Sequence, residues 1–268
     1  MKENLVENPV KASTCTDSEY MESQTYLVTG ASRGIGQALA LQLAKKGCRV
    51  ILLARPSENL NSATNEVQSH SSASFQTPCD LADPTSVADA VRHLLENVDR
   101  LDGLIHNAGT ISPIKPMLRA TGDDWARSIQ VNLIGVQQLT AGLAPLIEGE
   151  HRVRVSTISS GASLRPLGSW SAYCTAKAGL DMWARCLAHE GADDNISAIA
   201  VAPGIVDTGM QSDIRSAVED DFPLKSTFVG YHANGDLTNP ADVAEQLLPL
   251  LTEHSMEQSG LRFDVRDL

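Results

Sequence analysis

A tyrosine and a lysine occur at a spacing that would permit proton transfer. Tyr173 and Lys177 are four residues apart, and the serine pair Ser159-Ser160 lies shortly before them. On a helix, residues i and i+4 share a face, so the ammonium group would lie beside the phenol. An adjacent positive charge favours the phenolate, and we expect it to lower the pKa of Tyr173 from about 10 toward neutrality. Such a phenol can exchange a proton with a carbonyl oxygen.

A second group of residues has the features of a phosphate-binding turn. The segment 29–36 reads Thr-Gly-Ala-Ser-Arg-Gly-Ile-Gly, follows a strand-like run and opens a helical pattern. Glycine lets the backbone approach a pyrophosphate, whose charge is favoured at a helix N-terminus. A nicotinamide dinucleotide bound there would supply hydride beside the proton donor. The two groups together therefore predict reduction of a carbonyl compound.

The residues around this turn predict which dinucleotide binds. Arg33 opposes the helix dipole unless a phosphate joins it. NAD sites place an acid at the end of the second strand to bind the ribose 2′-hydroxyl, but here Ala54 and Arg55 occupy that place. Because Arg33 and Arg55 would attract a 2′-phosphate, the sequence predicts NADPH in preference to NADH.

Two further strand ends and one helical segment contribute polar or small residues. Asp80 either accepts a hydrogen bond from the adenine amino group or orders the turn before Asp83. Asn107-Ala108-Gly109 is small enough for a ribose to lie close. Asn132 is a poor helix former within a helical pattern, which indicates a buried polar task.

These residues need a scaffold, and the apolar pattern predicts one. Strand-like runs alternate with helical patterns from residue 25 onward, which favours right-handed crossovers and a mainly parallel, doubly wound α/β sheet with helices on both faces. We expect one domain over 25–268. The expected strands are 26–29, 49–53, 74–77, 104–106, 152–158, 196–202 and 261–265, and the expected helices are 34–46, one capped by Asp83-Pro84, 123–146, 171–190 and 241–251.

Composition limits the partners. The chain has 268 residues and a net charge of −12, which disfavours nucleic acid and membrane surfaces. Its five cysteines form no CxxC pair, which is typical of reduced cytoplasmic thiols and indicates no metal. Residues 1–24 are acidic, lack a signal sequence and are expected to be a disordered tail. The segment 204–239 is expected to be an irregular substrate loop, because it concentrates scarce aromatic residues at a strand end.

From residue 25 to 268 the chain resembles the short-chain dehydrogenase/reductase family. The resemblance rests on the glycine motif at 29–36, Asn-Ala-Gly at 107–109, Asn132, Ser160 with Tyr173-xxx-Lys177, and Pro203-Gly204. It implies a Rossmann sheet of order 3-2-1-4-5-6-7 and homodimers or homotetramers. The spacing of thirteen positions from Ser160 to Tyr173 selects Ser160 over Ser159.

The resemblance also implies the residues' roles. Tyr173 would donate the proton, Ser160 would orient the carbonyl, Lys177 would bind ribose and lower the pKa of Tyr173, and Asn132 would hold a water. Besides Tyr173 and Lys177, the expected cofactor-binding residues are Gly30, Ser32, Arg33, Gly34, Ile35, Gly36, Arg55, Asp80, Leu81, Asn107, Ala108, Gly109, Pro203, Gly204, Ile205 and Thr208.

Segments 202–211 and 259–264 resemble the sepiapterin reductase and benzil reductase branch. This implies an NADPH-dependent reductase of a small aromatic or apolar ketone or diketone. Substrate contacts are expected from Ser160, Trp170, Phe222 and Asp264. Asp264 could instead anchor a pterin or simply face solvent. An idle NADPH-binding module, and a polyol or steroid dehydrogenase working in the oxidative direction, remain open alternatives.

Overall fold

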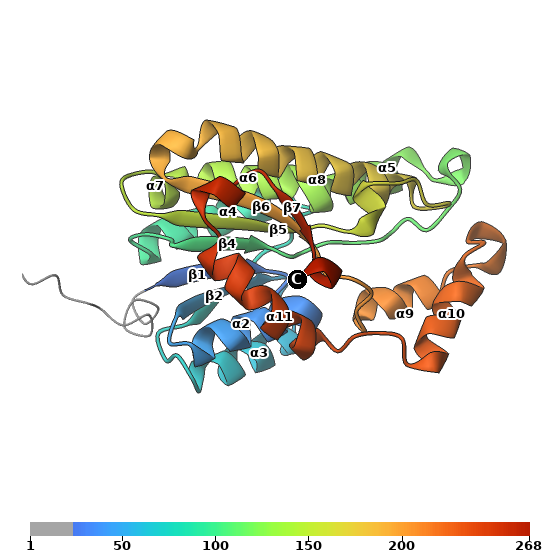
Figure 1. Ribbon diagram of the computed structural model, residues 1–268, viewed down its shortest axis with the longest axis horizontal. Helices are drawn as coiled ribbons and strands as arrows, with labels where there is room; N and C mark the ends of the chain where they lie inside the picture. The colour runs from blue at the N-terminus through green and yellow to red at the C-terminus, as the bar shows by residue number, and fades with distance from the viewer. Residues whose placement is uncertain (1–23) are drawn as a thin grey trace, which may run out of the picture.

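The computed structural model describes residues 24–268, so the tail predicted for 1–24 lies outside the described residues apart from Gln24. One seven-stranded sheet with the order β3-β2-β1-β4-β5-β6-β7 forms the centre (Figure 1). Every pair of neighbouring strands is parallel, and the predicted Rossmann order is confirmed. The strands are β1 (Thr25–Thr29), β2 (Arg49–Ala54), β3 (Phe75–Pro78), β4 (Gly103–His106), β5 (Val153–Ile158), β6 (Ile196–Ala202) and β7 (Arg262–Asp264).

Helices cover both faces of the sheet, as predicted (Figure 1). Because side chains alternate along a strand, Val50 and Leu52 of β2 pack into one core while Ile51 and Leu53 pack into the other. The first core is closed by α2 (Gly34–Lys45), α3 (Glu58–Gln68) and α11 (Pro240–Glu253), and the second by α4 (Pro84–Asn97), α6 (Gly135–Gly142), α7 (Ala144–Ile147) and α8 (Ser171–Glu190).

Local sequence signals explain most element boundaries. Each predicted strand agrees with the structure within one residue at each end, and β6 and α8 agree fully. The start of α4 is as expected, because Asp83 accepts a hydrogen bond from Thr85 N at 2.9 Å and Pro84 occupies the first turn. Helix α3 was not predicted. Its buried face is the short stripe Leu60, Ala63, Thr64 and Val67.

Two predictions about secondary structure were wrong. The helix expected over 123–146 is divided into α5 (Gly122–Ile129), a π-helical turn (Gln130–Ile134), α6 and α7. The segment 204–239 is not an irregular loop, because it contains α9 (Gly209–Arg215) and α10 (Lys225–Asn234). None of the residues in α10 is buried, so its sequence lacks the apolar stripe that signals a helix.

Three expectations drawn from composition concern membrane spans, thiols and metal sites. Within that range no helix has both the length and the apolar character needed to cross a bilayer. Cys48, Cys79, Cys174 and Cys186 are free thiols. The same residues contain no cluster of three or more side chains from His, Cys, Asp and Glu that could bind a metal ion.

Candidate active site

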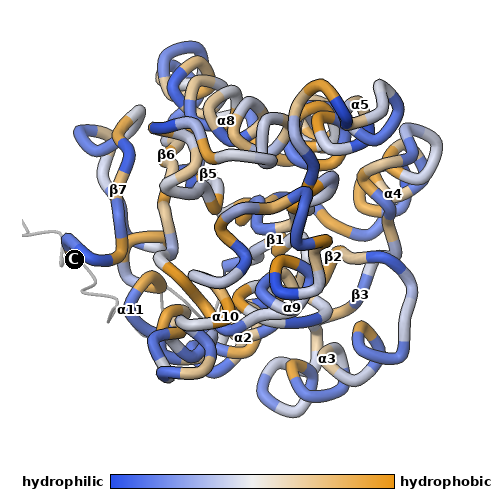
Figure 2. Tube along the Cα trace, turned by 90° about the vertical axis from the view of Figure 1, so that its right-hand side faces the viewer, coloured by the Kyte–Doolittle hydropathy of each residue, from blue (hydrophilic) through white to orange (hydrophobic). Residues whose placement is uncertain are grey.

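A cavity of about 520 Å³ lies at the carboxyl ends of β5 and β6, and residues of α9 and α10 form part of its wall. Figure 2 views the molecule from the side on which these two helices lie. The cavity wall contains hydroxyl groups from β5 and α8 and a largely apolar surface. The residues that line the cavity include Ile35, Ser160, Trp170, Tyr173, Pro203, Gly204, Ile205, Thr208, Phe228, Tyr231, Asp264 and Arg266.

Tyr173, Lys177 and Ser160 come together at this cavity. Tyr173 and Lys177 are buried on one face of α8, and Lys177 Nζ lies 5.8 Å from the centre of the Tyr173 ring. The ammonium group donates a hydrogen bond to Ile158 O at 2.8 Å. Ser160 follows β5, and its side chain is hydrogen-bonded to Tyr173. The three groups, from α8 and from the segment after β5, therefore form one polar cluster in an apolar wall.

The expected pKa of Tyr173 was wrong for the protein without a cofactor. Burial raises the pKa of Tyr173 to about 12, and the hydrogen bond from Ser160 offsets this only in part. Burial also lowers the pKa of Lys177 to about 8, against the charge of Asp181, which raises it. Desolvation exceeds the attraction between neighbours here because both side chains are removed from water.

Asn132 occupies the π-helical turn and is fully buried, with 0% exposure. Its amide oxygen accepts a hydrogen bond from Thr110 N at 3.0 Å, and its amide nitrogen donates to Thr110 O and Ser128 O, both at 2.9 Å. A Cβ on Gly109 would lie 2.8 Å from Asn132 Oδ1 and 3.6 Å from Lys177 Nζ. The turn thus brings Asn132 beside Gly109 and the lysine. The expected water-binding role stays a prediction.

The glycine turn is packed too tightly for side chains. Gly30 has a φ of +66°, and a Cβ there would lie 2.8 Å from Ala108 Cα. A Cβ on Gly36 would lie 2.5 Å from Gly30 O. Asn107 Nδ2 donates hydrogen bonds to Thr29 O and Gly30 O, at 3.0 and 3.3 Å. Asn107 therefore holds the turn, while the glycines keep its backbone bare.

The start of α2 suits an anionic group. Its N-cap, Arg33, makes no side-chain capping hydrogen bond, and the first turn contains no acid. The Arg33 guanidinium group lies against Gly209, since a Cβ there would be 2.9 Å from Arg33 Cζ, and a Cβ on Gly34 would be 3.1 Å from Thr208 Cγ2. Uncapped amides beside a cation and a bare turn fit the phosphates of a dinucleotide.

Most of the other expected cofactor residues follow strand ends or line the cavity. Asp80 Oδ1 accepts from Ala82 N at 3.0 Å and Asp80 Oδ2 lies 3.6 Å from Arg127, so this side chain orders its turn; binding of adenine stays a prediction. Leu81 is buried in the apolar core. Arg55 is exposed directly after β2, and Ser32 is partly exposed in the glycine turn. Ile35, Pro203, Gly204, Ile205 and Thr208 line the cavity.

One expected substrate residue does not reach the cavity wall. Phe222 has 0% exposure and stacks on Trp170, with ring centres 5.6 Å apart and an interplanar angle of 12°. Trp170 itself lines the cavity, together with Phe228 and Tyr231 from α10. Phe222 therefore supports the aromatic wall from behind, and its expected contact with substrate was wrong. Phe228 and Tyr231 belong to the segment 204–239 whose aromatic residues were expected near the substrate, and the structure places both in the cavity wall.

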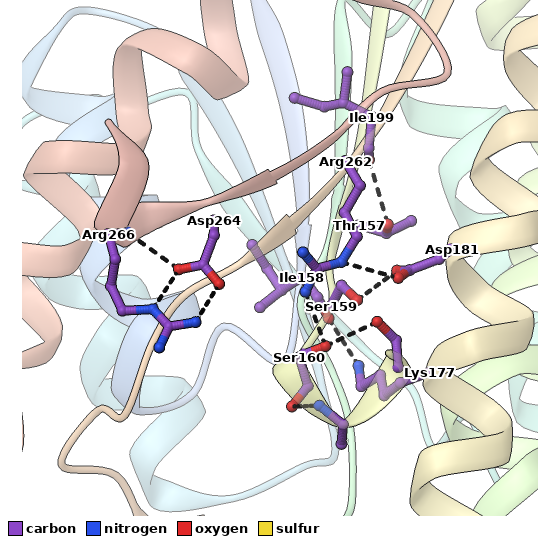
Figure 3. A network of polar contacts seen from close by, with 12 residues as sticks. Thr157, Ile158, Ser159, Ser160, Lys177, Asp181, Ile199, Arg262, Asp264 and Arg266 are labelled. Atoms are coloured by element: carbon purple, nitrogen blue, oxygen red, sulfur yellow. Dashed lines mark hydrogen bonds and ion pairs between the residues drawn. The ribbon is translucent and has the colours of Figure 1, made fainter. Parts of the chain in front are cut away.

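Asp264 lines the cavity, but its carboxylate is already occupied. Arg266 donates to it through Nε at 2.7 Å, Nη2 at 2.6 Å and its backbone N at 3.1 Å (Figure 3). Asp264 is 9% exposed, so the alternative that it simply faces solvent was wrong. The hydrogen bonds from Arg266 hold the pKa of Asp264 below its usual range.

Sequence reasoning missed a second polar network behind the site. Ser159 Oγ donates to Asp181 Oδ1, Arg262 Nε lies 3.2 Å from Asp181 Oδ2, and Arg262 Nη2 donates to Ser160 O at 3.1 Å (Figure 3). The signal for Asp181 was its position four residues after Lys177, on the same face of α8. Arg262 could not be found this way because β7 is distant in sequence.

The fold and this site are those of a nicotinamide-dependent oxidoreductase, and comparison with known proteins agrees. The chain belongs to the short chain dehydrogenase family, whose model matches residues 24–219. It is therefore an oxidoreductase that acts on C=O or CH–OH groups, and its family binds NAD or NADP.

The relatives are similar over nearly their full length. A benzil reductase ((S)-benzoin forming) from Bacillus cereus is 33% identical over 89% of this chain and 98% of its own, and one from Bacillus subtilis is 34% identical over 91% and 99%. The crystal structure of a short-chain dehydrogenase from Escherichia coli complexed with NADPH superposes with a TM-score of 0.79 at 25% identity, covering 94% of this chain and 100% of that one.

Proposed function

We propose that this protein is an NADPH-dependent carbonyl reductase whose substrate is a small aromatic or apolar ketone or diketone. The observation that carries the proposal is the hydrogen-bonded pair of Ser160 and Tyr173 in a cavity walled by Trp170, Phe228 and Tyr231. Aromatic walls favour aryl groups, while the two hydroxyl groups suit a carbonyl oxygen. Similarity to benzil reductases supports an aromatic diketone.

The mechanism follows from the environment of each side chain. When bound, a reduced nicotinamide supplies a hydride. Ser160 orients the carbonyl oxygen through its hydroxyl group. Tyr173 keeps its proton at neutral pH because burial raises its pKa to about 12, and it transfers this proton to the oxygen as negative charge develops there. An alkoxide is a stronger base than a phenolate, so the transfer is favourable. The Lys177 ammonium group then stabilises the phenolate.

The experiment that tests this function is a turnover assay of the purified protein with NADPH and benzil, followed by product analysis. Formation of the hydroxyketone with matching NADPH oxidation is expected. Absence of turnover with benzil, other diketones and aryl ketones would contradict the proposal. A pterin is the weaker candidate substrate, because Arg266 already occupies the Asp264 carboxylate that would bind it. Turnover of sepiapterin but not of benzil would reverse that order.

Preference for NADPH over NADH is a separate prediction. We expect kcat/KM to be higher with NADPH, since Arg33 and Arg55 can pair with a 2′-phosphate and Ala54 presents no acid to repel it. Arg55→Ala should lower kcat/KM with NADPH about tenfold, which corresponds to one charge-assisted hydrogen bond, and leave NADH unchanged. Arg185→Ala, which removes an exposed arginine on α8, is the control. A higher kcat/KM with NADH in the parent protein would refute the prediction.

The proposal also includes the cellular setting predicted from sequence. The enzyme would act in the cytoplasm, where the thiols of Cys48, Cys79, Cys174 and Cys186 would stay reduced. We propose a homodimer or homotetramer, since α8 exposes Met182 and the π-helical turn exposes Ile134 on the outer surface. Light scattering of the purified protein measures this directly.

A further inference from the structure

The carboxyl end of β5 is held by a charged network behind the cavity. Asp181 lies one turn after Lys177 on α8, and Arg262 lies on β7, which pairs with β6 rather than β5. Arg262 nevertheless reaches the end of β5 and donates to Ser160 O at 3.1 Å. The network therefore connects α8, β5 and β7 at the place where Ser160 leaves the sheet (Figure 3).

Each carboxylate oxygen of Asp181 has its own partner. Oδ1 accepts from Ser159 Oγ, and Oδ2 lies 3.2 Å from Arg262 Nε. The side chains of Asp181 and Arg262 are only 14% and 21% exposed. Charges that are this far removed from water are costly unless they are paired and hydrogen-bonded. Loss of either partner would leave the charge of the other without its ion pair beside the active site.

The arrangement determines which way the two serines point. Ser160 has extended backbone angles, φ −158° and ψ 156°. Successive side chains in extended chain point to opposite sides. Ser159 Oγ donates to Asp181, whereas the hydroxyl group of Ser160 accepts a hydrogen bond from Ala162 N at 3.1 Å and is hydrogen-bonded to Tyr173.

We propose that Asp181 and Arg262 are positioning residues of the active site, which fix the segment Ile158-Ser159-Ser160 so that Ser160 Oγ meets Tyr173 and Ile158 O receives the Lys177 ammonium group. The inference rests on the proposed function. It assigns to Asp181 a second effect, because its negative charge favours the charged form of Lys177 against burial. The charged or titratable groups facing that ammonium among the described residues are Tyr173 and Asp181 on α8, with Arg262 of β7 behind Asp181.

The test compares Asp181→Asn with the parent enzyme. We expect kcat for benzil to fall about tenfold, which is about 1.4 kcal/mol in the barrier, with little change in NADPH affinity. We expect the alkaline limb of kcat/KM near the Lys177 pKa of about 8 in the parent, and it should move to lower pH in the variant. Asp181→Asn combined with Arg262→Gln should cost little more than the larger single effect, because the two residues act as one unit.

Asp102→Asn is the matched control. Asp102 is another buried carboxylate, paired with Arg100 at 3.0 Å and bonded to Thr25 N at 2.7 Å, but it lies at the opposite end of the sheet. It should lower the melting temperature without moving the pH profile. An Asp181→Asn protein that is folded, with parental kcat and pH profile, would overturn the inference. So would equal effects of Asp181→Asn and Asp102→Asn on kcat.

A readout without substrate separates this inference from the proposed function. The pKa of Lys177 is measured by NMR on protein with isotope-labelled lysine, with the signal assigned from Lys177→Met. Asp181→Asn should lower this pKa, and an unchanged value would overturn the inference even if no carbonyl compound is reduced. Failure of the parent enzyme on the whole carbonyl panel would instead refute the proposed function.

Discussion

Tyr173→Phe is expected to reduce kcat for benzil by about a thousandfold, which is within the range that a positioned general acid contributes. The substitution removes the phenolic hydroxyl group and leaves the ring in its packing against Trp170, 5.9 Å away. The fold and NADPH binding should therefore be retained. Stopped-flow oxidation of NADPH measures turnover, and fluorescence titration measures cofactor binding.

Tyr231→Phe is the matched control for this change. Tyr231 lines the same cavity, so its substitution also removes a hydroxyl group from a tyrosine of the wall. It belongs to α10, a different element from those that contain Ser160 and Lys177, and it is distant from both in sequence. We expect only a slight change in kcat. Turnover of Tyr173→Phe at the parental rate would end the assignment of Tyr173 as proton donor.

Gly30→Ala should have the second large effect, on stability and cofactor binding together. An alanine at φ +66° carries backbone strain of about 1–3 kcal/mol, and its Cβ would lie 2.8 Å from Ala108 Cα. Two of the three nearest atoms, Ala108 Cα and Ala108 N, are main chain, so relief requires the glycine turn to move away from Asn107-Ala108. We expect a melting temperature about 5 °C lower and a KM for NADPH raised more than tenfold.

Gly122→Ala provides the comparison. Gly122 is the first residue of α5, and a Cβ there would meet nothing within 4 Å. Replacement should leave the KM for NADPH unchanged. A Gly30→Ala protein that binds NADPH with parental affinity would show that the turn does not hold the phosphates.

The predictability of the fold varied with the type of local signal. Strands of this sheet are short apolar runs between turns, so their positions were read correctly. The prediction of one continuous helix over 123–146 was wrong. The interruption at Asn132 depends on hydrogen bonds to Thr110 and Ser128, and Thr110 comes from another segment. Helix α10 was not predicted because it packs through aromatic residues rather than through an apolar stripe.

The candidate site divides in a similar way. The spacing of Tyr173 and Lys177 places them on one face of a helix in any fold, and the glycines of segment 29–36 mark a bare turn before a helix. The spacing to Tyr173 indicated Ser160 rather than Ser159, but the contacts from Asp181 and Arg262 that hold the end of β5 form only in the folded protein. The pKa of Tyr173 is likewise decided by burial, which no pairwise spacing reveals.

By itself the sequence determined the positions of the seven strands, the glycine turn and the shared helix face of Tyr173 and Lys177, because these depend on residues close together in the chain. The tertiary structure alone decided that Phe222 stands behind the cavity wall and that Asp181 reaches Ser159. Those outcomes depend on contacts and desolvation between segments that meet only after folding.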